Sequence, residues 1–250
     1  MKKYFITLML ICLLPLSAMA EQITVAAAAN VQFTLDELKA EFTKETGIDV
    51  KTVIGSSGKL TSQIENGAPF DVFMSADMDY PKRLDKDGTT LSEPKIYAYG
   101  YLVLWTLKDV DLSKGIAGFS DRSVKRIAIA SPKAAPYGRQ AVIAMKYNHL
   151  YPGISSKLVY GESISQVNQF ITTRAADVGI TAKSVVLAPH MKDKGKWVEV
   201  DPQSYEPIAQ GVVILKYAGR KHSAEAQKFD NFLFSAPAQD IFKKYGYKLP

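Results

Sequence analysis

The stretch Val53-Ile54-Gly55-Ser56-Ser57-Gly58-Lys59-Leu60 decides the fold. A β-branched run ends in four small residues, and a helix-like segment follows without a gap. The unpaired N–H groups of a helix start carry a partial positive charge, and small residues let a ligand approach them closely. The pattern therefore predicts a strand that runs into a helix through a turn able to hold an anion. A Ser at this position is also the ordinary N-cap of a helix, so the turn alone leaves both interpretations open.

Segments on both sides of this turn continue the alternation of strand and helix. Residues 22–29 are predicted to form a buried strand, followed by a helix from about Thr34 that stops at Gly47. After the turn we expect a helix at 59–66, a strand at 71–74 and a helix capped by residues 75–77. This βαβ spacing predicts a parallel, doubly wound sheet.

A second alternating region follows a continuous apolar strand expected at Tyr99–Leu107. Its expected strands are 127–130, 157–160 and 178–181, and its expected helices are 139–147, 164–173 and 183–187. A strand at 208–217 can return to the first region, and helices at 224–234 and 238–245 close the chain. The pattern indicates two α/β units joined by the strands that run between them.

Four expected strands end in the same sequence pattern, in which small or polar residues precede a helix. They are Ala29-Asn30, Ser56-Ser57, Ala135-Pro136-Tyr137 and Glu162-Ser163-Ile164. Ligands of open parallel sheets bind outside the carboxyl ends of the strands. Two lobes that face each other would aim all four helix starts into one cleft, which favours a binding site over four ordinary caps.

The first twenty residues have the pattern of a secretory signal. Lys2-Lys3 precedes an apolar run at Phe5–Leu16, and Ser17-Ala18-Met19-Ala20 matches a cleavage site. The apolar run is too short to span a membrane. Cys12 follows Ile11, whereas a lipoprotein site needs a small residue before the cysteine. We therefore expect cleavage after Ala20, no lipid anchor and export to the periplasm.

Composition narrows the class of the exported chain. Residues 21–250 contain no cysteine, so a chain bound for an oxidising compartment must be stabilised by its core rather than by disulfides. The net charge falls from +6 to +4 because Lys2 and Lys3 lie in the signal. The remaining basic residues are scattered, which argues against a nucleic-acid partner. His149, His190 and His222 have no neighbours at metal-ligand spacing, so no metal site is expected.

Five pieces of this sequence, in order, resemble the periplasmic molybdate-binding proteins of ABC transporters. They are residues 25–30, Ser56-Ser57-Gly58, residues 67–77, Pro136-Tyr137-Gly138 and residues 241–247. The resemblance covers the whole exported chain and implies an α/β, two-lobe type II periplasmic binding protein. Each lobe would be a mostly parallel sheet flanked by helices, with the ligand in the cleft. Residues 21–98 and 211–250 would form lobe I, and residues 99–210 would form lobe II.

The resemblance also implies a set of oxyanion ligands. These would be the N–H of Asn30, the N–H and hydroxyl of Ser57, and the N–H groups of Tyr137 and Ile164. Many relatives have Ser at the position of Asn30 and Tyr at the position of Ala182, where a hydroxyl reaches the ligand. This sequence departs from both patterns. It is similar to a family variant with Tyr at position 137, so we expect the Tyr137 phenol also to face the anion.

The function implied by this resemblance is capture of molybdate or tungstate and delivery to an inner-membrane ABC permease. The protein would be a monomer without enzymatic activity, cofactor or direct cation ligands. Two alternatives stay open. One is the same fold with another ligand, such as a sulfate-like anion, ferric ion or an organic acid. The other is an exported serine hydrolase, although Gly55-Ser56-Ser57-Gly58 lacks the Gly-x-Ser-x-Gly spacing.

Overall fold

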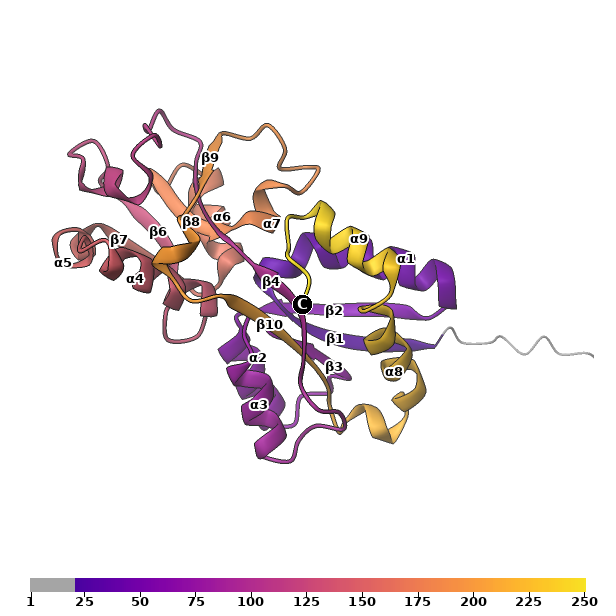
Figure 1. Cartoon of the computed structure of the whole chain (residues 1–250). Coiled ribbons are helices and arrows are strands. Elements are labelled where there is room, and N and C mark those ends of the chain that lie inside the picture. Colours follow the sequence, from indigo (N-terminus) through magenta and orange to yellow (C-terminus); the bar gives the residue numbers. More distant parts are fainter. Residues whose placement is uncertain (1–20) are drawn as a thin grey trace, which may run out of the picture.

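The computed structural model describes residues 21–250, so the expected signal lies outside the described residues. Two lobes, each built on a five-stranded sheet, lie next to each other (Figure 1). The lobe I sheet has the order β2-β1-β3-β10-β4, with β1 at Gln22–Ala28, β2 at Asp49–Gly55, β3 at Val72–Met74, β4 at Lys95–Gly100 and β10 at Ile208–Ile214. The lobe II sheet has the order β7-β6-β8-β5-β9, with β5 at Leu102–Thr106, β6 at Ile127–Ala130, β7 at Leu158–Gly161, β8 at Val178–Ala182 and β9 at Lys196–Glu199.

Helices flank both sheets. Those of lobe I are α1 at Gln32–Thr46, α2 at Ser57–Glu65, α3 at Asp79–Lys86, α8 at Ser223–Phe232 and α9 at Ala236–Lys244. Those of lobe II are α4 at Pro136–Tyr147, α5 at Tyr151–Ile154, α6 at Ile164–Thr172 and α7 at Lys183–Val186. Short 3₁₀ turns lie at Ala29–Val31, Gly115–Ser120, Ser155–Lys157, Pro202–Ser204 and Ala218–Arg220. Within residues 21–250 no helix has the length and apolar character needed to cross a membrane.

The packing of strand β1 explains why its sequence is apolar without alternating with polar residues. Val25 and Ala27 pack into the cluster formed with α1, α8 and α9, whereas Ala26 packs on the opposite face with α2 and α3. A strand covered on both faces has no polar side, so its hydrophobicity does not alternate. Helix α1 supplies one of the covers through Leu35, Leu38 and Phe42.

Both sheets are mixed rather than uniformly parallel. Strands β1, β2 and β3 are parallel, but β10 pairs antiparallel with β3 and β4. In lobe II, β6 is parallel to β7 and β8, but β5 is antiparallel to β8 and β9. The strands that run antiparallel, β5 and β10, are those that carry the chain from one lobe into the other. The parallel order expected from βαβ spacing therefore holds for β1, β2 and β3 in lobe I and for β6, β7 and β8 in lobe II.

The apolar run at 99–107 is two strands, not the one strand expected. β4 ends at Gly100 in the lobe I sheet, and β5 begins at Leu102 in the lobe II sheet. The chain crosses between lobes at Tyr101 and returns ahead of Ile208, so lobe I extends slightly further than the expected limits of 98 and 211. The sequence gives no sign of the crossing because the run of mostly apolar residues continues from β4, which is partly buried, into β5, which is fully buried.

Several helices begin earlier than expected, and two of them border the cleft. Helix α2 starts at Ser57 rather than Lys59, and α4 starts at Pro136 rather than Arg139. Proline suits the first position of a helix because the N–H that it lacks would have no partner there. Ser57 and Tyr137 consequently lie in the first turns of helices instead of in the preceding loops.

Candidate functional site

A small cavity lies between the lobes, where strands of both sheets end and helices begin. It is lined by Ala28, Ala29, Asn30, Gly55, Ser56, Ser57, Ala76, Ala135, Pro136, Tyr137 and Ile164. The four residues singled out from the sequence, Asn30, Ser57, Tyr137 and Ile164, all belong to this lining. The fold therefore brings together the four strand ends that share this sequence pattern.

The turn before α2 offers two kinds of donor. Ser56 has an extended backbone, with φ −75° and ψ 148°, and Ser57 is the first helical residue. Ser57 is fully buried, and its Oγ accepts a hydrogen bond from the N–H of Ala76 at 3.0 Å. Because the oxygen already acts as an acceptor, the hydroxyl proton remains available for a ligand. Ser57 thus provides both an N–H and an O–H group.

Lobe II contributes the starts of two helices. Tyr137 and Ile164 lie in the first turns of α4 and α6, where backbone N–H groups have no carbonyl partner within the helix. Gly138 allows α4 to start directly against the end of β6, because a methyl group there would overlap the carbonyl of Ala130. The sequence Pro136-Tyr137-Gly138 therefore sets the position of the Tyr137 N–H through backbone packing.

Asn30 is held by its side chain and by its carbonyl. Its Nδ2 donates to Oε1 of Gln210 at 2.5 Å. Its carbonyl oxygen accepts from Ser184 Oγ at 2.7 Å and from the Tyr247 hydroxyl at 3.2 Å. These bonds occupy the Nδ2 group and the carbonyl oxygen of Asn30, and the backbone N–H remains a donor that a ligand can use.

No charged side chain lines the cavity. Every lining residue is uncharged, so an anion here would be attracted by the partial positive charge of the helix starts. Burial raises the pKa of Tyr137 well above its ordinary value, so its hydroxyl keeps its proton at neutral pH. The surroundings therefore offer donors and no carboxylate acceptor, which suits an anion that carries no proton.

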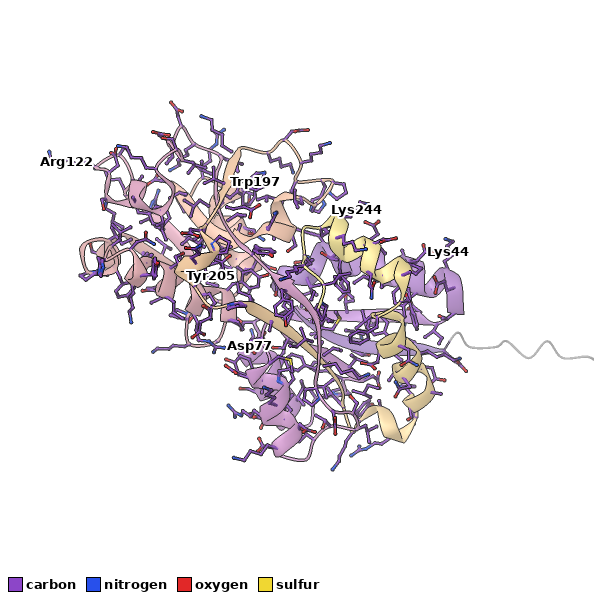
Figure 2. All side chains as sticks on the ribbon, in the orientation of Figure 1. Lys44, Asp77, Arg122, Trp197, Tyr205 and Lys244 are labelled. Atoms are coloured by element: carbon purple, nitrogen blue, oxygen red, sulfur yellow. The ribbon has the colours of Figure 1, made fainter. Side chains whose placement is uncertain are left out.

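Contacts across the cleft surround the cavity. Lys59, next to the Ser57 turn, pairs with Glu162 at 2.6 Å, next to the Ile164 turn. On the other flank, Arg139 of α4 pairs with Asp77 of lobe I, which Figure 2 places on the part of lobe I that faces lobe II. Each ion pair joins opposite charges from the two lobes, and each has a partner within two residues of a cavity-lining position. The structure is therefore a closed arrangement of the lobes.

Comparisons with known proteins identify the family. The model of the bacterial extracellular solute-binding proteins matches residues 23–248. The chain belongs to this family. This solute-binding protein is 38% identical to the molybdate-binding protein ModA of Azotobacter vinelandii over 238 residues, which cover 95% of this chain and 94% of that one. It is also 38% identical to ModA of Rhodobacter capsulatus over 236 residues, covering 94% and 91% of the two chains.

A solved structure extends the likeness to three dimensions. The periplasmic molybdate-binding protein of Azotobacter vinelandii superposes with a TM-score of 0.86 at 34% identity, covering 91% of this chain and 99% of that one. The agreement confirms the type II periplasmic binding fold expected from the sequence.

Two parts of the site in this solute-binding protein were not among the predicted ligands. Ser56 lines the cavity, and its buried hydroxyl has no hydrogen-bond partner among residues 21–250. Gln210 lies behind the cavity and binds the carboxamide of Asn30. The sequence could have indicated Ser56, because it lies directly before the predicted ligand Ser57. No local pattern could identify Gln210, because it lies in an apolar strand far along the chain from Asn30.

Other polar residues of this solute-binding protein have partners away from the cavity. Lys183, beside Ala182, forms an ion pair with Glu199. Asp71 accepts the N–H of Thr24 at 2.7 Å and contacts His222 Nδ1 at 3.1 Å. In the described part of the chain, no group of three histidine, cysteine or carboxylate side chains could hold a metal ion.

Proposed function

We propose that this protein binds molybdate in the periplasm and delivers it to an ABC importer. The observation that carries the proposal is the convergence of Asn30, Ser57, Tyr137 and Ile164 on one uncharged cavity. The relatives named as molybdate-binding proteins match nearly the whole chain, which supports the same ligand here. Since these relatives are binding proteins, they also argue against the hydrolase alternative. No histidine lines the cavity within residues 21–250, so Ser57 lacks a base there.

The proposed ligands are backbone and hydroxyl donors. The N–H groups of Asn30, Ser57, Tyr137 and Ile164 would bind the anion oxygens, together with the Ser57 hydroxyl. Ser56 would add a further hydroxyl, since its buried oxygen has no hydrogen-bond partner among the described residues. These groups neutralise charge through dipoles, as helix starts do for other anions.

Donors alone select the protonation state of the ligand. Hydrogen phosphate keeps a proton at neutral pH and needs an acceptor, which this lining lacks. Sulfate has the same charge as molybdate, so the size of the closed cavity must exclude it. Tungstate has nearly the same size and charge as molybdate, so we propose that it binds as well.

The proposal includes the route of the protein to its site of action. The signal pattern of residues 1–20 supports export and cleavage after Ala20. The product would be an unlipidated monomer that begins at Glu21 and meets an inner-membrane permease. N-terminal sequencing and intact mass of exported protein test the processing step. Retention of Met1 or a lipid on Cys12 would contradict it.

Titration calorimetry of the metal-free exported protein tests the ligand. We expect binding of molybdate and tungstate and no binding of sulfate or phosphate under the same conditions. Molybdate at a hundred times its dissociation constant should raise the free energy of unfolding by about 2.7 kcal/mol. Equal stabilisation by sulfate at the same concentration would overturn the size argument, and stabilisation by phosphate would overturn the argument from donors.

A further inference from the structure

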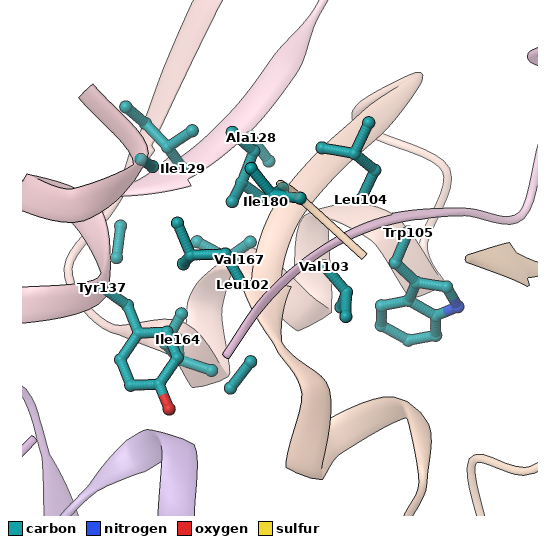
Figure 3. Close-up of a cluster of buried hydrophobic side chains, with 14 of the residues drawn as sticks. Leu102, Val103, Leu104, Trp105, Ala128, Ile129, Tyr137, Ile164, Val167 and Ile180 are labelled. Carbon is teal, nitrogen blue, oxygen red and sulfur yellow. The ribbon is translucent and has the colours of Figure 1, made fainter. Parts of the chain in front are cut away.

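The phenol of Tyr137 reaches past the cavity toward the strand that links the lobes. Figure 3 shows Tyr137 beside Ile164, with its oxygen directed away from the rest of the hydrophobic cluster. Tyr137 is only 2% exposed, and among residues 21–250 its hydroxyl has no hydrogen-bond partner. The hydroxyl lies against Gly100 at the end of β4, where an added methyl group would overlap it. The hydroxyl thus lies next to a residue that does not line the cavity.

A second unpaired group lies on the same side of Gly100. Gln210 of β10 is fully buried, and its Oε1 accepts from Asn30 Nδ2 at 2.5 Å and from the Tyr97 hydroxyl at 3.0 Å. Its Nε2 has no partner in the described part of the chain. A methyl group on Gly100 would lie 2.8 Å from this nitrogen. The unpaired hydroxyl of Tyr137 and the unpaired Nε2 of Gln210 therefore both lie next to Gly100, which has no side chain.

The two unpaired groups are chemically complementary. A buried polar group without a partner costs free energy, and a carboxamide next to a hydroxyl can remove that cost for both. A phenol can donate or accept, so it pairs with either end of the carboxamide. Tyr137 belongs to lobe II and Gln210 to lobe I, and neither of the two groups has a hydrogen-bond partner among the described residues. A hydrogen bond between them therefore forms only when the lobes approach further.

We infer that Gln210 is a positioning residue that joins the two anion-binding turns, holding Asn30 in lobe I and pairing with the Tyr137 phenol of lobe II upon closure. The inference rests on the proposed anion site and assigns the phenol a role different from that of a direct ligand. Gln210 then aligns the N–H of Asn30 with that of Tyr137, and Gly100 provides the space for the contact.

A double-mutant cycle on the exported protein tests the inference. Tyr137→Phe removes the hydroxyl, and Gln210→Met removes the carboxamide at similar volume. Molybdate affinity should fall about threefold to tenfold for Tyr137→Phe, the range for one neutral hydrogen bond. It should fall further for Gln210→Met, because Asn30 also loses its partner. The double variant should bind like Gln210→Met alone, and the losses should appear in the dissociation rate.

Controls separate this role from direct ligation and from misfolding. Tyr245→Phe removes a hydroxyl from the buried tyrosine that follows α9, outside the junction, and should leave affinity unchanged. Thermal unfolding of each variant without ligand shows whether it is folded. Gly100→Ala offers an independent variant, which should weaken molybdate binding because the methyl group displaces the phenol. In this background, Tyr137→Phe should cause almost no further loss of affinity.

The cycle has decisive outcomes. Losses that multiply in the double variant would mean that the phenol contacts the anion directly, and the inference would be wrong. Unchanged affinity in Gln210→Met would also overturn it. A parent protein that binds none of the oxyanions would instead contradict the proposed function, so the two failures are distinguishable.

Discussion

The backbone N–H of Gly58 donates a hydrogen bond across the cleft to the carbonyl of Ala134, at 2.9 Å. It is a direct contact between the backbones of the two lobes. Gly58 follows Ser57 in α2, and Ala134 lies just before the Tyr137 turn. A hydrogen bond at this point couples the separation of the lobes to the separation of two turns that we propose bind the anion.

We expect Gly58→Ala to weaken molybdate binding by about tenfold without destabilising the unliganded protein. A methyl group at Gly58 would lie 2.7 Å from the Tyr80 hydroxyl, 3.0 Å from Ala134 Cα and 3.1 Å from the Ala134 carbonyl oxygen. The end of the Tyr80 side chain can move aside, whereas the Ala134 backbone can yield only if the lobes move apart. Overpacking of this kind costs about 1–3 kcal/mol. Alanine is also the better helix former by up to about 1 kcal/mol, so unfolding without ligand should not become easier.

Calorimetry and urea unfolding on the same variant measure the two effects. Gly153→Ala is a matched control in lobe II, because its methyl group would meet nothing within 4 Å. Affinity equal to that of the parent would show that the lobes do not need this close approach.

We expect Ser57→Ala to lower molybdate affinity by about ten- to a hundredfold. The substitution keeps the N–H and removes a hydroxyl whose bond to an anion is worth about 1.5–3 kcal/mol. The loss of the acceptor for Ala76 should lower unliganded stability by less than the loss in binding. Ser56→Ala should weaken binding while leaving unliganded stability nearly unchanged, since its hydroxyl has no partner within residues 21–250.

Ser62→Ala, at an exposed position of the same helix, provides the control for both serines. If calorimetry shows the same dissociation constant for Ser57→Ala as for the parent, the Ser57 hydroxyl does not contact the anion and serves only the structure of the helix start.

We expect the ion pair between Arg139 and Asp77 to contribute modestly to affinity. The Asp77 side chain is 15% exposed and that of Arg139 is 33% exposed, so water screens part of the attraction. Pairs of this kind contribute up to about 1 kcal/mol, which limits the effect of Arg139→Gln to about fivefold. The effect should shrink at high salt and in the presence of Asp77→Asn.

Molybdate titrations at low and high ionic strength measure the contribution of this pair. Glu41→Gln removes an ion pair within lobe I, between Lys44 and Glu41, and should leave affinity unchanged. Independent effects of the Arg139 and Asp77 substitutions would show that the two side chains do not act as a pair across the cleft.

We expect Asp177→Asn to destabilise lobe II at neutral pH and to have little effect in acid. Burial alone would raise the pKa of Asp177, but hydrogen bonds from Lys108 and from the N–H groups of Arg126 and Lys125 outweigh it and lower the pKa. A carboxylate with a lowered native pKa stabilises the fold above its unfolded pKa, and this stabilisation disappears as pH falls through the native pKa.

Urea unfolding at neutral pH and near pH 3 tests this sign. The difference between the parent and Asp177→Asn should be about 1–3 kcal/mol at neutral pH and smaller in acid. Asp240→Asn changes an exposed carboxylate on α9 and is the control. A difference that grows as the pH falls would contradict the assignment.

The sequence by itself determined the local elements and the chemistry of the site. The turn of small residues at 55–58 predicted a strand and a helix start, because these depend on neighbouring residues, and it allowed either an anion site or an ordinary N-cap. Proline and glycine on either side of Tyr137 marked the second turn in the same way. The resemblance then linked these turns to a family that the comparisons confirmed. Asn30, Ser57, Tyr137 and Ile164 line one cavity, whereas their roles as ligands stay a prediction.

Only the tertiary structure determined the features that depend on contacts between residues far apart in the sequence. It split the run at 99–107 between two sheets, because an apolar strand fits either core equally well. It also brought Gln210 to Asn30, and the Tyr137 hydroxyl to Gly100, across the junction between the lobes. Contacts between residues this far apart along the chain leave no local periodicity or motif. The residues of the proposed anion site could therefore be predicted from neighbouring residues and the resemblance, whereas the contacts between the lobes required the folded chain.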